Sequence, residues 1–237
     1  MRRRPSRILL LAVPLALAGC APQPASEQGR EIYWLYNFFM VAAAVVFVVV
    51  GGLIVWSVVR YRDDGSEDEP AQVHGNRTIE AVWTLIPLLI VIVLVVASFK
   101  SLNRVSYQTP RPAVLVEVIA FQWQWRFDYP EAGVEVVGTR DRPAVLVVPV
   151  GEPVHVRLTS ADVQHGFFIP RFLYKRDAIP GRINDFDLTI TEQGTFQGEC
   201  AFICGLAHSD MEFLVRAVPP EEFRRWLAAN GANGAAR

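Results

Sequence analysis

This sequence has few cysteines and no excess of positive charge. Its 237 residues include only three cysteines, too few for a disulfide scaffold, and four histidines. Lysine and arginine total 23 against 24 aspartate and glutamate, so the net charge is −1 and nothing favours nucleic acid as a partner. No Cys-x2-Cys-His occurs, which excludes the attachment motif of a c-type haem, and no internal repeat is evident.

Charge is also missing from two long stretches of the chain. No charged residue lies between Glu31 and Arg60, and a second uncharged run extends from residue 81 to residue 99. A helix needs about 20 predominantly apolar residues to cross a bilayer. The sequence therefore predicts transmembrane helices at about residues 33–59 and 80–99. The alternative is a pair of buried helices in a soluble protein.

Positive charge flanks the segment that connects these two runs. Arg60 and Arg62 precede it and Arg77 follows it, and arginine near membrane spans favours the cytoplasmic side. The mature N-terminus and everything after Lys100 are then expected outside the cytoplasm.

The N-terminus has the pattern of a secretion signal. Four arginines within the first seven residues precede an apolar run from Ile8 to Leu17. The run ends in Leu17-Ala-Gly-Cys20, which resembles a bacterial lipobox. We expect a lipoprotein signal peptide at residues 1–19, lipidation of Cys20, and an N-terminal segment with both helices at residues 20–105. An ordinary or an uncleaved signal is the alternative.

The remainder of the chain changes to short segments of alternating polarity. Four of them are predicted strands and are separated by Pro, Gly, Asn and Asp: residues 113–120, 144–149, 153–159 and 185–190. The length of this remaining part of the chain suits a single β-sandwich, which takes about 100 residues. We expect an extracytoplasmic domain at residues 106–229 that ends in a short helix at 220–229, followed by a frayed tail at 230–237.

A cluster of soft ligands lies near the end of this domain. Cys200, Cys204, His208 and Met211 fall within twelve residues, and His165 supplies a second imidazole upstream. Sulfur and imidazole without carboxylate select copper over hard cations, and a single blue-copper ion uses only one Cys, two His and a weak Met. The extra thiolate predicts two coppers bridged by sulfur. The alternatives are a structural disulfide and a zinc site.

Five motifs in order support a resemblance to one family. They are His74-Gly-Asn with Glu80-Ala-Val-Trp-Thr-Leu-Ile-Pro, then Phe121-Gln-Trp-Gln-Trp-Arg-Phe, Asp162-Val-Gln-His-Gly-Phe, Lys175-Arg-Asp-Ala-Ile-Pro-Gly-Arg and the cysteine–methionine segment. From about residue 30 to residue 228 the chain resembles subunit II of haem–copper cytochrome c oxidases. This resemblance implies a membrane-anchored all-β protein, in which a two-helix transmembrane hairpin precedes a cupredoxin-like β-sandwich.

The resemblance also implies a ligand set for a dinuclear copper A centre. Cys200 and Cys204 are expected to bridge two coppers, and His165 and His208 each to bind one. Met211 is expected to be a weak ligand, and the backbone carbonyl of Phe202 completes the set. The family usually has glutamate at position 202, where it helps to hold magnesium or manganese. A phenyl ring cannot bind a hard cation, so this chain is expected to supply no magnesium ligand there.

Two further roles and the partners follow from the same resemblance. Trp123 is expected to receive the electron, and Glu80 to lie at the mouth of a proton pathway into subunit I. The implied function is to pass electrons from cytochrome c or a small copper protein to haem in subunit I, where oxygen reduction to water is coupled to proton translocation. Subunit I and other oxidase subunits are the expected partners, in a bacterial plasma membrane with the sandwich on its outer, periplasmic face.

Two other functions remain open at this stage. A quinol oxidase subunit II shares the architecture but would carry a vestigial copper site. A membrane-bound copper-delivery protein of the thioredoxin-like kind shares the Cys-x3-Cys spacing, but it is expected to have an α/β fold and a single anchor.

Overall fold

A computed structural model describes residues 23–62, 72 and 74–234 of the chain. The chain forms two compact units. One unit comprises the chain up to Tyr33 together with everything from Ser106 onward, and the other is Trp34–Val105. The predicted signal peptide at residues 1–19 and the lipidation site Cys20 lie outside the described residues.

Two long helices, α2 (Glu27–Arg60) and α3 (Arg77–Val105), contain the uncharged runs. Both begin before the apolar residues from which we predicted them, at first turns that polar side chains cap. Ser26 Oγ accepts a hydrogen bond from the Gly29 N–H at 3.0 Å, and Asn76 Oδ1 accepts one from the Thr78 N–H at 3.0 Å. Such caps satisfy N–H groups that a helix leaves unpaired at its start.

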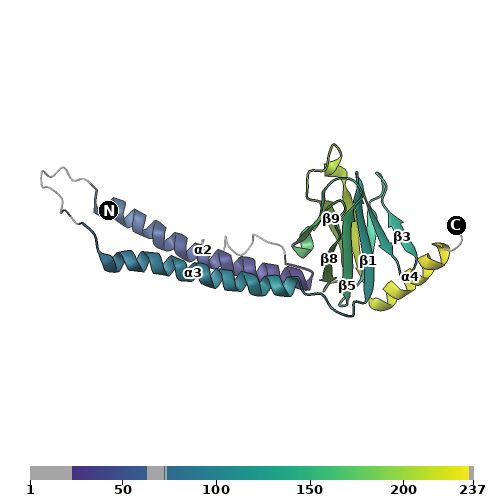
Figure 1. Ribbon diagram of the computed structural model, residues 1–237, viewed down its shortest axis with the longest axis horizontal. Helices are drawn as coiled ribbons and strands as arrows, with labels where there is room; N and C mark the ends of the chain where they lie inside the picture. The colour runs from purple at the N-terminus through teal and green to yellow at the C-terminus, as the bar shows by residue number, and fades with distance from the viewer. Residues whose placement is uncertain (1–22, 63–71, 73, 235–237) are drawn as a thin grey trace, which may run out of the picture. The chain divides into compact units, whose positions relative to one another are not determined.

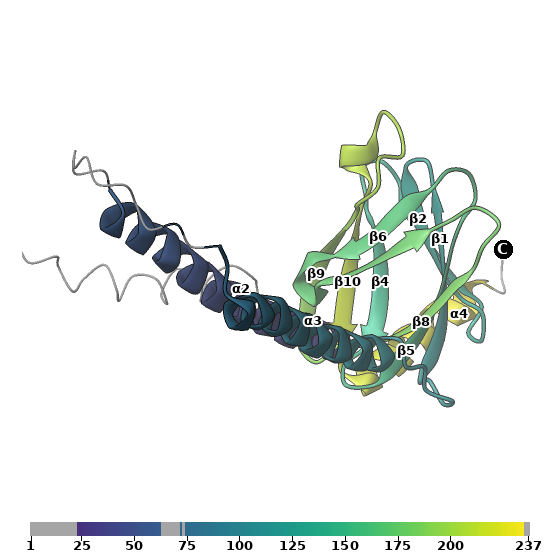
Figure 2. The same ribbon diagram turned by 60° about the vertical axis from the view of Figure 1, so that its left-hand side comes forward.

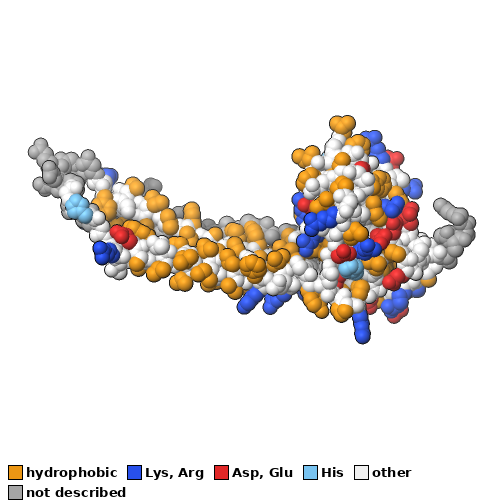
Figure 3. Space-filling model, viewed as in Figure 1, with side chains coloured by type: hydrophobic (Ala, Val, Ile, Leu, Met, Phe, Trp, Pro, Cys, Tyr) orange, Lys and Arg blue, Asp and Glu red, His pale blue; other side chains and the backbone are white. Residues whose placement is uncertain are grey.

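The surface of these helices is suited to lipid or to other membrane helices. Both are long and apolar enough to cross a membrane. Their large apolar side chains are mostly exposed in the isolated chain, and Figure 3 shows an almost continuous hydrophobic surface with the charged side chains near the helix ends. A soluble helix would turn one apolar stripe toward a core and polar groups toward water. The predicted membrane hairpin is thereby favoured over a buried soluble helix pair.

After α3 the chain forms a sandwich of two five-stranded sheets (Figures 1 and 2). The first has the order β3-β2-β1-β5-β8 and the second the order β4-β10-β9-β6-β7. The strands are β1 (Val114–Phe121), β2 (Gln124–Tyr129), β3 (Val134–Val137), β4 (Ala144–Pro149), β5 (Pro153–Ser160), β6 (His165–Ile169), β7 (Tyr174–Ala178), β8 (Asn184–Thr189), β9 (Gly194–Cys200) and β10 (Glu212–Val218). The predicted fold class, two apolar helices followed by a β-sandwich, is confirmed.

Alternating burial along the strands creates the core between the sheets. β1 and β5 bury every second residue, as expected for strands with one face toward a core. Trp125 and Phe127 of the first sheet and Phe167 and Phe213 of the second are completely buried. The rings of Phe167 and Phe213 stack with their centroids 4.7 Å apart, and Trp125 packs against both. This aromatic cluster lies directly beside the ends of β6 and β9, so it supports the residues that follow.

The segment before α2 belongs to the sandwich unit. Ser26 forms a β-bridge with Ile190, and Gln28 accepts a hydrogen bond from the Thr189 N–H at 3.0 Å. Ala25 and Ser26 are both completely buried. Residues that precede the helix pair in the sequence and residues that follow it therefore both belong to the sandwich unit.

The C-terminal helix differs from its prediction. α4 runs over Pro220–Gly234, so residues 230–234, predicted as part of a frayed tail, are helical. Asn230 donates a hydrogen bond to the Trp226 carbonyl at 2.8 Å. A Cβ on Gly231 would lie 2.5 Å from the Ala132 carbonyl oxygen, so the helix packs closely on the turn after β2. This tertiary contact, invisible to local sequence patterns, extends the helix.

Candidate metal centre

The predicted ligands come together at one end of the sandwich. His165 begins β6, Cys200 ends β9, and the loop between β9 and β10 carries the others, with His208 in a short 3-10 helix, η2 (His208–Asp210). Figure 2 shows this loop extending beyond the ends of β9 and β10. The Cys200 N–H donates to the Met211 carbonyl at 3.0 Å and closes the base of the loop. Residues distant in sequence are thus held beside one another by strand pairing.

Cys200 and Cys204 are free thiols, and each has its own imidazole neighbour. The sulfurs of Cys200 and Cys204 lie 3.7 Å apart. His165 Nδ1 lies 3.9 Å from the Cys200 sulfur, and His208 Nδ1 lies 3.7 Å from the Cys204 sulfur. The donors of His165, Cys200 and Cys204 all fall within 4.8 Å of one another, and all three residues are buried. This is the geometry of a shared site rather than of two separate ones.

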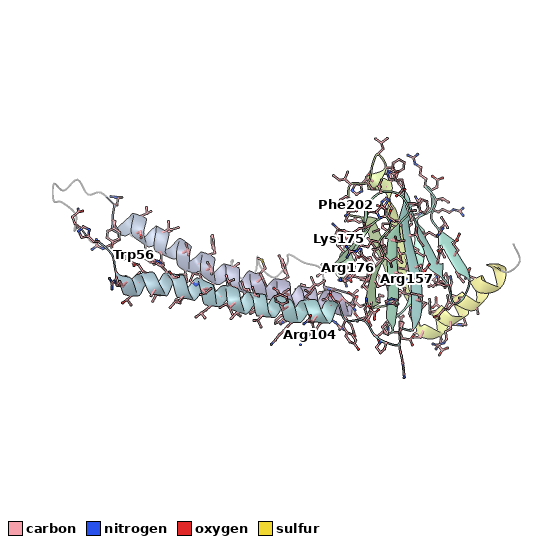
Figure 4. All side chains as sticks on the ribbon, in the orientation of Figure 1. Trp56, Arg104, Arg157, Lys175, Arg176 and Phe202 are labelled. Atoms are coloured by element: carbon pink, nitrogen blue, oxygen red, sulfur yellow. The ribbon has the colours of Figure 1, made fainter. Side chains whose placement is uncertain are left out.

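Two weaker donors complete the arrangement. The Phe202 carbonyl oxygen lies 3.3 Å from the Cys200 sulfur, and the Met211 sulfur lies 3.9 Å from the Cys204 sulfur. Met211 is completely buried. The side chain of Phe202 is 39% exposed, and the residue lies near the end of the sandwich that carries the loop (Figure 4). The donor set is two thiols, two imidazoles, a thioether and a carbonyl, a chemistry that fits copper.

Asp162 determines how His165 faces the thiols. The Asp162 Oδ1 lies 2.9 Å from His165 Nε2, and His165 has no exposed surface. A proton on Nε2 is therefore directed to the carboxylate, which leaves the Nδ1 lone pair toward Cys200. Burial alone would lower the pKa of His165, but the hydrogen bonds with Cys200 and Asp162 outweigh it and raise that pKa.

The two thiols differ in how readily they ionise. Burial would raise the pKa of Cys200, but its hydrogen bonds, above all with His165, lower that pKa to about 6. Burial and the neighbouring Cys200 thiolate raise the pKa of Cys204 to about 12. A second thiolate beside the first is costly until positive charge neutralises the pair. Hydrogen bonds therefore stabilise one thiolate, and a bound cation would stabilise the second beside it.

From the sequence we named Asp162 only as the start of the Asp162-Val-Gln-His-Gly-Phe motif and assigned it no role of its own. In the structure its carboxylate is hydrogen-bonded to His165. Its other oxygen accepts the Gln122 N–H at 2.6 Å, so the same carboxylate also fixes the strand turn before Trp123. The spacing Asp-x2-His was the available signal, because an outer carboxylate commonly orients a metal-binding imidazole.

Replacing Asp162 with asparagine is expected to lower copper affinity about 10- to 100-fold, the usual cost of losing an outer-shell partner. The amide would no longer favour the Nε2–H form of His165 as strongly as the carboxylate does. Copper affinity is measured by competition with a chelator on the full-length chain in detergent. Asp210→Asn is the matched control, since Asp210 is exposed in the same region and its side chain pairs with Ser209 rather than with a proposed ligand. Equal affinities in both variants would contradict the assigned role.

Trp123 lies beside the cysteine loop without belonging to the ligand group. Gly205 has a φ of +129°, and a Cβ there would lie 3.1 Å from the Trp123 indole nitrogen. Gln122 donates a hydrogen bond to the Cys204 carbonyl at 2.7 Å. Glycine adopts this backbone conformation without strain and leaves room for the ring. Sequence patterns did not reveal the roles of Gln122 and Gly205, because their partners lie in distant parts of the chain.

The remaining candidates lie elsewhere. Glu80 is exposed in the first turn of α3, within the helical unit. His155 in β5 lies outside the ligand group, and its Nδ1 is 2.7 Å from an Asp187 carboxylate oxygen. Trp125 is completely buried, and its indole N–H donates to the Met211 carbonyl at 3.5 Å.

Comparisons with known proteins point to one family. The family descriptions "Cytochrome C oxidase subunit II, transmembrane domain" and "Cytochrome C oxidase subunit II, periplasmic domain" match residues 15–101 and 137–218. A probable cytochrome c oxidase subunit 2 of Streptomyces avermitilis is 33% identical over 96% of this chain and 86% of its own length. The cytochrome c oxidase subunit 2 of Alkalihalophilus pseudofirmus is 31% identical over 96% of this chain and 69% of its own length.

Solved structures include a similar domain. The periplasmic domain of subunit II of cytochrome oxidase of Bradyrhizobium japonicum is 32% identical and covers 53% of this chain and 99% of its own, with a TM-score of 0.49.

Proposed function

Because the chain belongs to the cytochrome c oxidase subunit II family, we propose that it takes electrons from a cytochrome c or a small copper protein at a dinuclear copper A centre and passes them to haem in subunit I. The chain is a subunit of a haem–copper oxidase, an oxidoreductase complex, and two apolar helices anchor it in the membrane. Oxygen reduction coupled to proton translocation belongs to the partner subunit. The sandwich is proposed to face the periplasmic side of a bacterial plasma membrane, with further oxidase subunits around it.

One observation carries the copper assignment. The two cysteine sulfurs lie 3.7 Å apart, and each has an imidazole nitrogen within 3.9 Å on its own side. A mononuclear blue-copper site needs only one thiolate, and a structural disulfide needs no imidazoles. The doubled set of soft donors supports two metal ions that share the sulfurs.

The protein's part is to hold these donors rigidly and away from water. Cys200, Cys204, His165, His208 and Met211 would bind the coppers through their side chains, and residue 202 through its carbonyl. When bound, the copper pair supplies a one-electron redox group. Burial of His165, Cys200 and Met211 within a packed sandwich limits their movement. A site that moves little needs little reorganisation when its charge changes.

The route for electron uptake is proposed to begin at Trp123. Its indole contacts the glycine that follows Cys204, and the preceding Gln122 is hydrogen-bonded to the Cys204 carbonyl. The ring therefore lies against the residue that directly follows a proposed ligand. Glu80 is proposed to lie at the mouth of a proton pathway, on the evidence of the family resemblance alone. Phe202 is proposed to supply no side-chain ligand to magnesium, because a phenyl ring offers no oxygen.

The two rival functions are weaker. A thioredoxin-like copper-delivery protein requires an α/β fold, whereas the described domain is a β-sandwich. A quinol oxidase subunit with a vestigial site would not require two thiols and two imidazoles to lie close together, as they do here. Copper loading separates this second alternative from the proposal.

The test is to load the reduced full-length chain with copper in detergent and to record copper content and the electron paramagnetic resonance spectrum. The full chain is required because residues 25–28 belong to the sandwich unit. We expect about two coppers per chain, since one blue-copper ion would leave a thiolate and an imidazole unused. One electron shared equally between two copper nuclei gives a seven-line hyperfine pattern.

Other results would contradict the proposal in distinguishable ways. A single copper with a four-line pattern indicates a mononuclear site. No copper together with a Cys200–Cys204 disulfide that persists under reductant indicates a vestigial site. Zinc bound in preference to copper under the same conditions indicates a structural metal.

A further inference from the structure

An exposed apolar side chain lies at the centre of the ligand loop. Leu206 is 98% exposed and lies midway between the proposed ligands Cys204 and His208. A leucine at the tip of a loop gains nothing for folding when it remains in water. Scattered surface leucines are common, so the informative feature is what surrounds this one.

Leu206 lines a cavity of about 380 Å³ together with Trp123. Gln124, Arg140, Ala207 and Asp210 complete the lining. Trp123 is half-buried, so part of its ring remains accessible beside the leucine. A cavity with an aromatic ring and an exposed aliphatic side chain has the composition of the central contacts of protein interfaces. We call these six residues the Trp123–Leu206 surface.

Charge on this surface is balanced. The lining contains one cation, Arg140, and one anion, Asp210. The turn that carries Arg140 adds Asp141 and Arg142, again one of each sign. Asp162, three residues before the proposed ligand His165, is committed to that imidazole and to the Gln122 N–H. These residues therefore supply no excess charge of one sign, which is what attracts a strongly charged partner from a distance.

We propose that Leu206 is the specificity-determining contact for the electron donor at Trp123, and that this donor is a small redox protein whose cofactor edge is surrounded by apolar, nearly uncharged surface. A lysine-rich donor is a poor fit because the residues of the Trp123–Leu206 surface offer no excess of acidic groups. This inference rests on the proposed function, since it names the partner of the same electron-uptake site.

The position of the loop supports this choice of partner. Gly205 packs against the indole of Trp123, and Leu206 follows it directly. A donor that covers Leu206 would therefore also cover Trp123, next to the carbonyl of Cys204 to which Gln122 is hydrogen-bonded. Docking and electron uptake would then use the same few residues.

The test compares two reduced donors on the whole oxidase complex: a lysine-rich cytochrome c and a cytochrome c of near-zero net charge. We expect the near-neutral donor to have the higher kcat/KM, with little change as ionic strength rises. Leu206→Ser is expected to raise its KM about tenfold or more, the effect of losing one buried aliphatic contact. Ile203→Ser is the matched control, because Ile203 is 84% exposed in the same loop but does not line the cavity.

A small artificial reductant that bypasses docking separates this inference from the proposed function. Leu206→Ser should leave oxygen consumption with that reductant unchanged. An unchanged KM in Leu206→Ser, or a lysine-rich donor that is faster and loses its rate steeply with salt, would overturn the docking inference while leaving the copper centre intact. Failure of the wild-type complex to oxidise even the small reductant would instead count against the proposed function. A Leu206→Asn variant with wild-type copper content repeats the measurement should the serine variant lose copper.

Discussion

Replacing Cys200 with serine is expected to abolish the two-copper centre and, with it, the oxidation of the donor by the oxidase complex. Despite burial, hydrogen bonds, above all with His165, lower the pKa of Cys200 and so stabilise an anionic donor for a metal. A serine hydroxyl remains protonated at neutral pH and is a hard ligand. We expect copper affinity to fall by more than the roughly 10- to 100-fold loss caused by removing an outer-shell partner.

The measurement is copper content and the paramagnetic spectrum of the full-length variant in detergent, followed by donor oxidation in the assembled complex. Ser209→Ala is the control, because Ser209 lies in the same loop and its hydroxyl donates to Asp210 rather than to a proposed ligand. Cys204→Ser should also lose the shared-electron spectrum, since sulfur bridging requires both thiolates. Retention of about two coppers in Cys200→Ser would rule out the bridging role.

Much of the architecture could be predicted because its signals are local. Transmembrane helices need long uncharged runs, and the stretches after Glu31 and before Lys100 are such runs. Strands with one buried face alternate in polarity, and the predicted strand at residues 113–120 corresponds to β1. The metal candidates were recognisable because cysteine, histidine and methionine are rare in this chain and four of them share twelve residues.

Other features depended on contacts between distant segments. No local pattern shows that Ser26 bridges to Ile190, or that Gly231 packs against Ala132 and so extends α4. The hydrogen bond from Gln122 to Cys204 joins residues 82 positions apart. Such contacts are consequences of the sandwich topology, in which strands distant in sequence become neighbours. They determine how the ligands are supported, while the local motif determines which ligands are present.

Replacing Trp125 with alanine is expected to lower the free energy of unfolding by about 3–5 kcal/mol, the usual cost of emptying a large aromatic site. Trp125 has no exposed surface and contacts His165, Phe167 and Phe213. Such a loss is a large fraction of the total stability of a typical domain, about 5–15 kcal/mol. Urea unfolding of the full-length chain in detergent, followed by near-ultraviolet circular dichroism, measures it.

The same substitution should also disturb the copper centre, because the indole packs against the His165 ring and its N–H donates to the Met211 carbonyl. Trp226→Ala is the matched control: it removes an indole of the same size that packs on Tyr129 and Phe223, outside the ligand group. We expect the control to lose less stability, since Trp226 is only partly buried, and to keep an unchanged copper spectrum. A Trp125→Ala variant with wild-type stability, or with a copper spectrum identical to that of the control, would show that the aromatic core and the ligands are mechanically independent. Coupling between the two is expected instead, because well-packed side chains transmit the loss of a neighbour to the groups they support.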